Sequence, residues 1–362
     1  MKQSYCYQLA GNAQIVMINK TITLIFCPLL MCSALSAKEA LQSSELPLDI
    51  GGTTDKSSRW HSFPQESPAP NRHPIFSIFP EPLPYGRTAI TIEASNQFLR
   101  TDFEIADNGR TFARIDGEDW GLTVDLAREF GPMLFNLRIR GTWRSGGWSD
   151  QAFASWHTLL GTPRGGREEA PKFRLDYTLI RDGQLVAQLT KDRACLMDTD
   201  LAVLYPFGNS ESGGRLGLSI QAPTGSRSDF SGSGGWDELV GIALWKSWGY
   251  FRFHTQLEYA LLGVSDSNPY NLLIEHSNQK RAWIGIAYQG RGHSFWRGLG
   301  LDISIGYTES PYSIGVSRID TSGWQQHWSF SHTRLPNWKI GFTEEAGTYT
   351  SPDLSVFLKY CL

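Results

Sequence analysis

Segments of about ten residues in which apolar and polar side chains alternate recur from residue 86 to the end of the chain. The clearest is Leu299 to Thr308, where one face carries large apolar residues and the other carries Gly, Ser, Thr and Asp302. A period of two predicts β-strands with one apolar and one polar face. The other predicted strands are 88–98, 119–129, 133–143, 199–206, 214–222, 236–246, 251–261, 279–289, 325–333, 337–345 and 354–362.

Alternation alone also fits a soluble β-sandwich, which has one face on its core and one in water. Three features favour a membrane barrel with lipid outside and a polar lumen inside. The polar faces carry unrelated charges, and the alternation continues to Leu362. In addition, short connections at 131–132, 247–249 and 335–337 alternate with long ones at 144–171, 223–235 and 264–278.

The number of strands must be even if both ends of the barrel lie on one side of the membrane. We count twelve, with 173–189 as an extracellular hairpin whose tip is the strong turn signal Asp182-Gly183. Counting that hairpin as two spanning strands gives fourteen. The sequence therefore predicts an all-β fold, a transmembrane antiparallel up-and-down β-barrel over residues 86–362, with a short helix at 150–160 in an extracellular loop.

The first part of the chain reads as an export signal. Residues 1–37 contain Lys20, an apolar run from Ile22 to Met31 and the small residues Ala34, Ser36 and Ala37, which is typical of a signal peptide whose start could be Met17. Residues 38–85 are rich in Pro and Ser and predict a periplasmic lead-in. We therefore expect the mature protein in the cell outer membrane of a Gram-negative bacterium.

Composition excludes several classes. A net charge of -3 and a pI near 6.3 give no basic surface for nucleic acid. The mean hydropathy is -0.28, and no long apolar block follows the signal, which argues against membrane-spanning helices. No metal-binding spacing occurs, so we expect no metal and no cofactor. Cys195 and Cys361 are the cysteines of the mature chain, and the sequence leaves open whether they pair.

Charged residues and a histidine on the predicted inward faces and at the barrel mouth are the candidate site. One interpretation is a ring that selects charged solutes, and the other is a set of charge pairs that fills the lumen. The two signs occur together, which favours charge pairs because desolvated charges need partners. The candidates are Asp116, Glu118, Arg138, Arg140, Arg167, Arg174, Arg252, His254, Glu258, Asp302, Glu345 and Asp353.

His157, on the predicted helix, is a weak candidate for a catalytic base. A hydrolase needs a nucleophile, a base and a third group to orient the base, and no spacing in the chain encodes such a trio. A structural role is the stronger interpretation of His157, so no catalytic residue is assigned.

Short motifs in a specific order also resemble an uncharacterised domain-of-unknown-function family of Gram-negative outer-membrane β-barrel proteins. They span about residue 71 to the end and lie at 71–84, 116–118, 145–167, 223–225, 232–237, 341–347 and 351–353. The family pattern has Gly-Asp before the strand near residue 200, where this chain has Met197-Asp198. The resemblance implies a barrel and an outer-membrane location and carries no activity.

Our first functional hypothesis is a passive channel or structural barrel with a plugged lumen of mixed charge. The alternatives are an outer-leaflet lipid-modifying enzyme and a surface binding protein that acts through loops such as 223–235 and 264–278. The expected partners are outer-membrane lipid, lipopolysaccharide and the barrel-assembly machinery. The sequence indicates no solute.

Overall fold

The computed structural model describes residues 88–362 except 106–110, 148–150, 152–154, 156–157, 159–170, 210, 227–230, 233, 264–277, 291–295, 297, 310–322 and 347–353. Its regular structure is almost entirely strand. The strands are β1 (Thr88–Ile105), β2 (Thr111–Phe130), β3 (Met133–Ser145), β4 (Tyr177–Arg181), β5 (Gln184–Leu189), β6 (Arg193–Leu196), β7 (Thr199–Gly208), β8 (Ser212–Ala222), β9 (Asp237–Trp248), β10 (Phe251–Leu261), β11 (Gln279–Gln289), β12 (Leu299–Thr308), β13 (Gly323–His332), β14 (Leu335–Ala346) and β15 (Leu354–Cys361).

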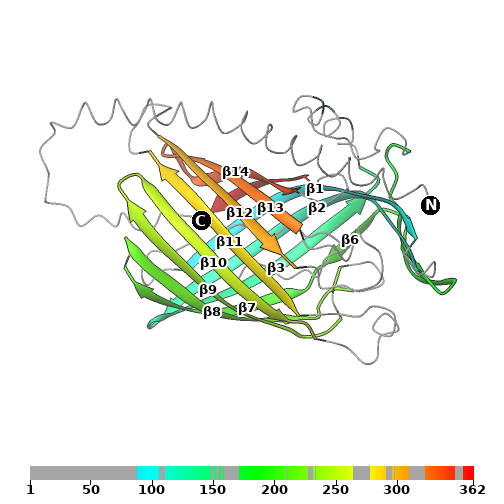
Figure 1. The fold of residues 1–362 in the computed structure, drawn as a ribbon, viewed down its shortest axis with the longest axis horizontal. Helices are drawn as coiled ribbons and strands as arrows, with labels where there is room; N and C mark the ends of the chain where they lie inside the picture. Colours follow the sequence, from blue (N-terminus) through cyan, green and yellow to red (C-terminus); the bar gives the residue numbers. More distant parts are fainter. Residues whose placement is uncertain are drawn as a thin grey trace, which may run out of the picture. The chain divides into compact units, whose positions relative to one another are not determined.

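Twelve of these strands form a closed antiparallel ring (Figure 1). Its order is β1, β2, β3 and then β7 to β15, and β15 pairs back onto β1 from Thr91–Cys361 to Gln97–Ser355. Closure leaves the ring without an exposed edge, which a sheet in lipid requires. The predicted twelve-stranded barrel is confirmed.

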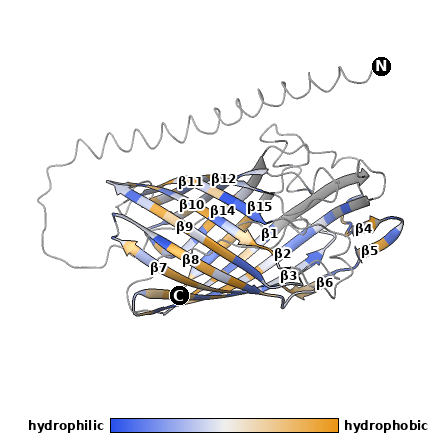
Figure 2. Cartoon of the chain, turned by 60° about the horizontal axis from the view of Figure 1, so that its bottom comes forward, coloured by the Kyte–Doolittle hydropathy of each residue, from blue (hydrophilic) through white to orange (hydrophobic). Residues whose placement is uncertain are grey.

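The remaining strands belong to one excursion from the ring. Strands β4 and β5 form the predicted hairpin, and Asp182 and Gly183 at its tip have φ angles of 50° and 75°, as a two-residue primed turn needs. Strand β4 pairs with the first residues of β2, Thr111 to Arg114. The paired parts of β2 and β1 therefore extend beyond the ring together with the hairpin (Figure 2). Strand β6 pairs with residues 141–144 near the end of β3, and β7 pairs with residues 134–138 along the same edge of β3.

Tight turns gather at one rim of the barrel, which we call the short-turn rim; the opposite end is the long-loop rim. Gly131 and Gly249 open two turns of two residues with φ of 59°. The turn between β13 and β14 consists of Thr333 and Arg334, so its predicted position at 335–337 was wrong by two residues. Leu335 and Pro336 instead begin β14.

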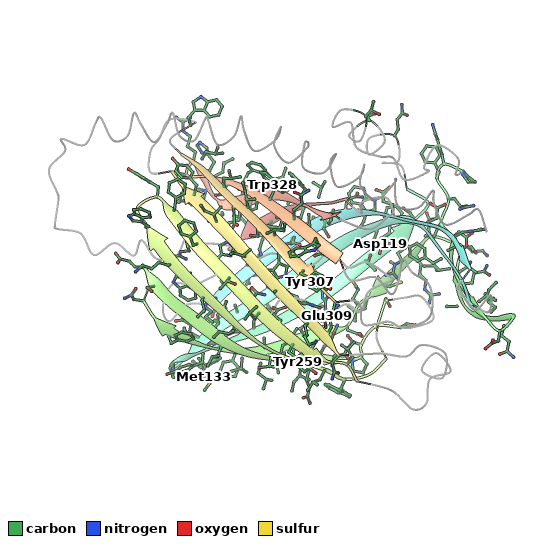
Figure 3. All side chains as sticks on the ribbon, in the orientation of Figure 1. Asp119, Met133, Tyr259, Tyr307, Glu309 and Trp328 are labelled. Atoms are coloured by element: carbon green, nitrogen blue, oxygen red, sulfur yellow. The ribbon has the colours of Figure 1, made fainter. Side chains whose placement is uncertain are left out.

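The exposed side chains of the strands form an apolar belt around the ring, and Figure 2 shows hydrophobic and hydrophilic residues alternating along the strands. Aromatic side chains flank it at both rims: Trp143, Tyr259 and Trp324 at the long-loop rim, and Phe130, Tyr205 and Trp248 at the short-turn rim. Tyr259 and Met133 are labelled near the two ends in Figure 3. A lipid-facing belt between two aromatic girdles is the surface of an outer-membrane barrel.

Little helix is described. Gln151, Ser155 and Thr158 are helical residues within the predicted helix at 150–160, and the Ser155 hydroxyl donates a 2.8 Å hydrogen bond to the Gln151 carbonyl. No helix in the described part of the chain is long and apolar enough to cross a membrane.

Candidate functional site

The inward faces of the strands carry polar and charged side chains that solvent barely reaches. Arg144 and Gln256 are 0% exposed, and Arg138 and Asp302 are 3% and 4% exposed. A barrel of about eight strands is filled by its own side chains, whereas one of 16 to 18 has an open channel. Here long polar side chains are buried inside the ring of twelve strands, together with apolar ones such as Leu134, Leu204 and Trp283.

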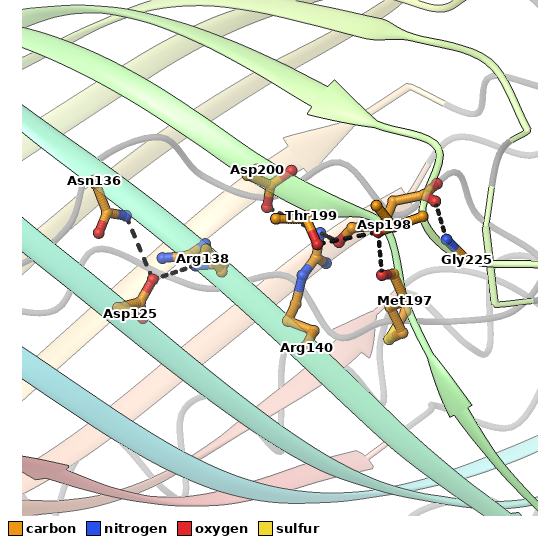
Figure 4. Close-up of polar contacts among 10 residues, drawn as sticks. Asp125, Asn136, Arg138, Arg140, Met197, Asp198, Thr199, Asp200 and Gly225 are labelled. Atoms are coloured by element: carbon orange, nitrogen blue, oxygen red, sulfur yellow. Dashed lines mark hydrogen bonds and ion pairs between the residues drawn. The ribbon is translucent and has the colours of Figure 1, made fainter.

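Charge pairs cross one wall of the interior, formed by β2, β3 and β7 (Figure 4). Arg138 on β3 donates from Nε to Asp125 Oδ1 on β2 at 2.5 Å, and both side chains are at most 5% exposed. Arg140 on β3 donates from Nη2 to Asp200 Oδ2 on β7 at 2.9 Å. These pairs compensate the charges where water cannot solvate them.

Asp198 connects this wall to the loop between β8 and β9. Its carbonyl oxygen accepts from Arg140 Nη2 at 3.1 Å, and its Oδ1 accepts from the Gly225 amide at 2.8 Å. A Cβ at Gly232 would lie 2.7 Å from that same Oδ1, so glycine there allows the loop to approach. At Gly225 and Gly232 this loop is therefore held against the inner wall at the long-loop rim.

A second buried cluster lies where β2, β3 and β4 meet. Arg144 Nε is 3.1 Å from Asp119 Oδ2, and the Tyr177 hydroxyl donates to Asp119 Oδ1 at 3.1 Å. The Arg144 guanidinium also lies over the Tyr177 ring, 5.7 Å from its centre. Because Tyr177 belongs to β4, this cluster ties the β4–β5 hairpin to the barrel.

The opposite wall, from β10 to β14, has its own contacts. Arg281 Nη1 is 3.4 Å from Glu258 Oε2, and His254 Nε2 is 3.2 Å from Asp302 Oδ1. The His254 side chain reaches β12 across β11 at Gly285, where a Cβ would lie 2.5 Å from both His254 Nε2 and Ser304 Oγ. Glycine at 285 therefore permits this bridge.

Near the short-turn rim, the guanidinium groups of two arginines both lie over the ring of Trp245. The guanidinium carbons of Arg215 and Arg252 lie 5.8 Å and 5.9 Å from the Trp245 ring centre. Arg252 Nε also donates to Ser247 Oγ at 3.0 Å. Stacking on an aromatic face stabilises a cation that is removed from water.

We predict that Gly285→Ala destabilises the barrel, whereas Gly141→Ala is tolerated. The new methyl group at 285 must displace His254 or Ser304, and overpacking of this kind costs about 1–3 kcal/mol. At Gly141 the nearest atom to a Cβ is the Cys195 carbonyl oxygen at an ordinary 3.7 Å. Urea unfolding in detergent micelles measures both variants, and equal midpoints would contradict the bridge.

The structure distributes the sequence candidates over three places. Arg138, Arg140, Arg252, His254, Glu258 and Asp302 are buried on inward faces. Asp116 and Glu118 are also buried, but on the opposite face of β2 from Asp119, near the rim, where Arg174 Nη2 lies 2.6 Å from Asp116 and Asn96 donates to Glu118. His157, Arg167 and Asp353 and the side chain of Glu345 lie outside the described residues.

Several interior partners were missed by the sequence analysis: Glu93, Asp119, Asp125, Arg144, Asp198, Asp200, Arg281 and Lys359. A signal for two of the pairs existed. The two-residue turn at 131–132 pairs Phe130 with Met133, so that paired positions in this hairpin sum to 263. That register places Asp125 opposite Arg138 and Asp119 opposite Arg144.

Within the described residues, no three His, Cys, Asp or Glu side chains are grouped so that they could hold a metal ion. Ser304 and His254 both contact Asp302, at 3.1 Å and 3.2 Å. In a hydrolytic triad the histidine lies between the other two groups. Here the carboxylate lies between them, so this trio has the wrong order for activating a nucleophile.

The model of a family described as "Protein of unknown function (DUF3187)" matches residues 69–360. No curated protein matches the chain. Among solved structures, an outer-membrane channel from Pseudomonas putida F1 is similar at 13% identity, covering 77% of this chain and 96% of the other, with a TM-score of 0.48. The KdgM porin, solved in complex with disordered oligogalacturonate, has 10% identity, 75% and 98% coverage and a TM-score of 0.37. The transport unit of the autotransporter AIDA-I from Escherichia coli has 12% identity, 78% and 93% coverage and a TM-score of 0.38.

Proposed function

Because the chain belongs to the DUF3187 family, for which no activity is described, we propose from its own geometry that it is a passive outer-membrane channel that is closed at rest. The closed ring, apolar belt and aromatic girdles are those of a barrel that resides in the outer membrane. Export by a signal peptide within residues 1–37 and insertion by the barrel-assembly machinery are parts of the same proposal.

The observation that carries the proposal is the paired charge inside the barrel. A barrel whose only task is structural can fill its interior with apolar side chains, since buried ion pairs are weak contributors to stability. Beside an apolar cluster that contains Leu134 and Leu204, this interior instead holds buried charges on three levels of the wall, at Arg144, Arg138 and Arg252. To admit water, an interior lined in this way needs only a rearrangement of its side chains and of the loop at 223–235.

We expect the intact protein to show small and infrequent conductance steps in planar lipid bilayers, and Asp198→Ala to raise the open probability several-fold. The change removes the acceptor of the Gly225 amide and releases the loop at the long-loop rim. Asn209→Ala is the matched control, because Asn209 Oδ1 accepts from the Glu211 and Ser212 amides in the turn at the opposite end of β7.

Heat-modifiable migration on gels must be retained by both variants, so that folded barrels are compared. Large and steady conductance from the intact protein would contradict closure at rest. An absence of conductance from the intact protein and from Asp198→Ala would contradict the channel itself.

A further inference from the structure

A row of uncharged hydrogen-bonding groups crosses the interior wall opposite the charge-paired one. Strand register aligns its members as direct neighbours from β9 to β15. None of its members has a carboxylate, ammonium or guanidinium group, and one of them, His254, contacts the Asp302 carboxylate. Its members are Trp245, His254, Gly285, Ser304, His327, Thr343 and Ser355.

Two polar atoms on β13 have no hydrogen-bond partner among the described residues. His327 is 1% exposed, and its Nδ1 lies 3.1 Å from Thr343 Oγ1 while its Nε2 has no partner. Gln325 is 4% exposed, and its Oε1 also has no partner. The two residues are two apart on the same inward face, so their side chains start about 7 Å from each other. A buried polar atom without a partner is costly, which makes a hydrogen-bonding guest favourable there.

An aromatic ring lies beside these two groups. Trp283 on β11 is 2% exposed, and a Cβ at Gly306 would come within 2.2 Å of its indole. Gly306 in turn is the register partner of Gln325. The indole therefore lies over the glycine whose strand neighbour is Gln325. An apolar ring face with a few adjacent polar groups is a common construction for binding small molecules.

Two neighbouring carboxylates whose side chains the structure describes are already engaged. Asp302 accepts from Ser304 and contacts His254, while Glu258 contacts Arg281 and accepts from Gln256. A charged solute would have to replace one of these partners and leave a buried charge uncompensated, which is expensive. A neutral guest avoids that cost.

We propose that His327 of this row, together with Gln325 and Trp283 beside the row, forms a binding site for a neutral polyhydroxylated solute, a saccharide, on its way through the barrel. Its hydroxyl groups donate to His327 Nε2 and Gln325 Oε1, and the apolar face of its ring packs on Trp283. The inference rests on the proposed channel function and names the solute class of the same interior.

The test compares entry of solutes of similar size into vesicles that contain the whole protein. Swelling rates are measured with arabinose and glucose as neutral probes, and with glucuronate and glucosamine as charged ones. We expect the neutral sugars to enter faster. Gln325→Leu with His327→Phe should lower the advantage of the neutral sugars about tenfold, since both hydrogen bonds to the solute are lost.

Ser329→Ala is the matched control, because Ser329 is also inward-facing on β13 and 5% exposed, but it is not one of the groups proposed to contact the solute. Quenching of tryptophan fluorescence by glucose, in detergent-solubilised protein, gives a second readout that does not require permeation. Ion conductance with equal entry of neutral and charged probes would overturn the saccharide site and leave the channel. Saturable quenching that the double variant loses, without any conductance, would support the site and overturn the channel. Quenching that is absent from the native protein, or equal in the double variant, would overturn the site.

Discussion

Leu257→Arg is expected to prevent most of the protein from assembling into a heat-modifiable barrel, whereas Leu261→Arg is expected to assemble nearly normally. Both leucines lie on the outer face of β10, and they are 53% and 43% exposed. Leu257 is near the middle of the strand and Leu261 is at its end on the long-loop rim. An arginine on the lipid face of a barrel costs about 2–4 kcal/mol at the membrane midplane and about 0–1 kcal/mol near the interface.

The measurement is the folded fraction after refolding into lipid vesicles, read from gel migration before and after heating. The two variants have the same substitution, strand and face, so depth in the bilayer is the variable that differs. Equal folded fractions would contradict the placement of the apolar belt in lipid.

The second large effect is expected at the cluster that ties the β4–β5 hairpin to the barrel. Arg144→Met should lower the free energy of unfolding by about 3–5 kcal/mol, because it leaves the Asp119 carboxylate buried without its cation. Tyr177→Phe removes only the hydrogen bond from the hydroxyl and should cost about 1 kcal/mol.

A double variant, Arg144→Met with Asp119→Asn, should recover much of the loss because no buried charge remains without a partner. Lys280→Met is the exposed control: its 3.4 Å pair with Glu309 has 68% and 31% exposed side chains, and such pairs contribute about 0–1 kcal/mol. Urea unfolding in detergent measures the series. A double variant as unstable as Arg144→Met would show that packing, and not charge, is what the cluster supplies.

Local patterns were enough to predict the ring. Alternation placed all twelve of its strands, because lipid and the polar interior impose two different faces on each strand. Asp182-Gly183 marked the hairpin tip because both positions need positive φ. The β13–β14 turn was misplaced because Leu335 and Pro336 interrupt the apolar alternation at the start of β14, where proline resembles a turn residue.

The interior was only partly predictable, for a geometric reason. Within a hairpin the turn fixes which residues face each other, so Asp125 with Arg138 follows from the turn at 131–132. Arg140 and Asp200 belong to strands separated by the β4–β6 excursion, and no turn sets their register. The His254 contact with Asp302 skips a whole strand and depends on the absence of a side chain at Gly285. The alternation of apolar and polar residues shows on which face of the sheet a side chain lies, but not which side chains it contacts.

Closure of the ring also determines the order in which the molecule can form. Most neighbouring strands are consecutive in the chain and can zip together as hairpins, whereas the seam joins β1 to β15, with Thr91 and Cys361 separated by 270 residues. Contacts between such distant residues carry a large loop-closure entropy and form slowly. Strand β15 can pair early with β14, but its other edge and the edge of β1 must therefore wait unpaired until nearly the whole sheet exists. A chain that lost β15 would keep its hairpins but present the edges of β1 and β14 to other molecules, as an open sheet prone to aggregation.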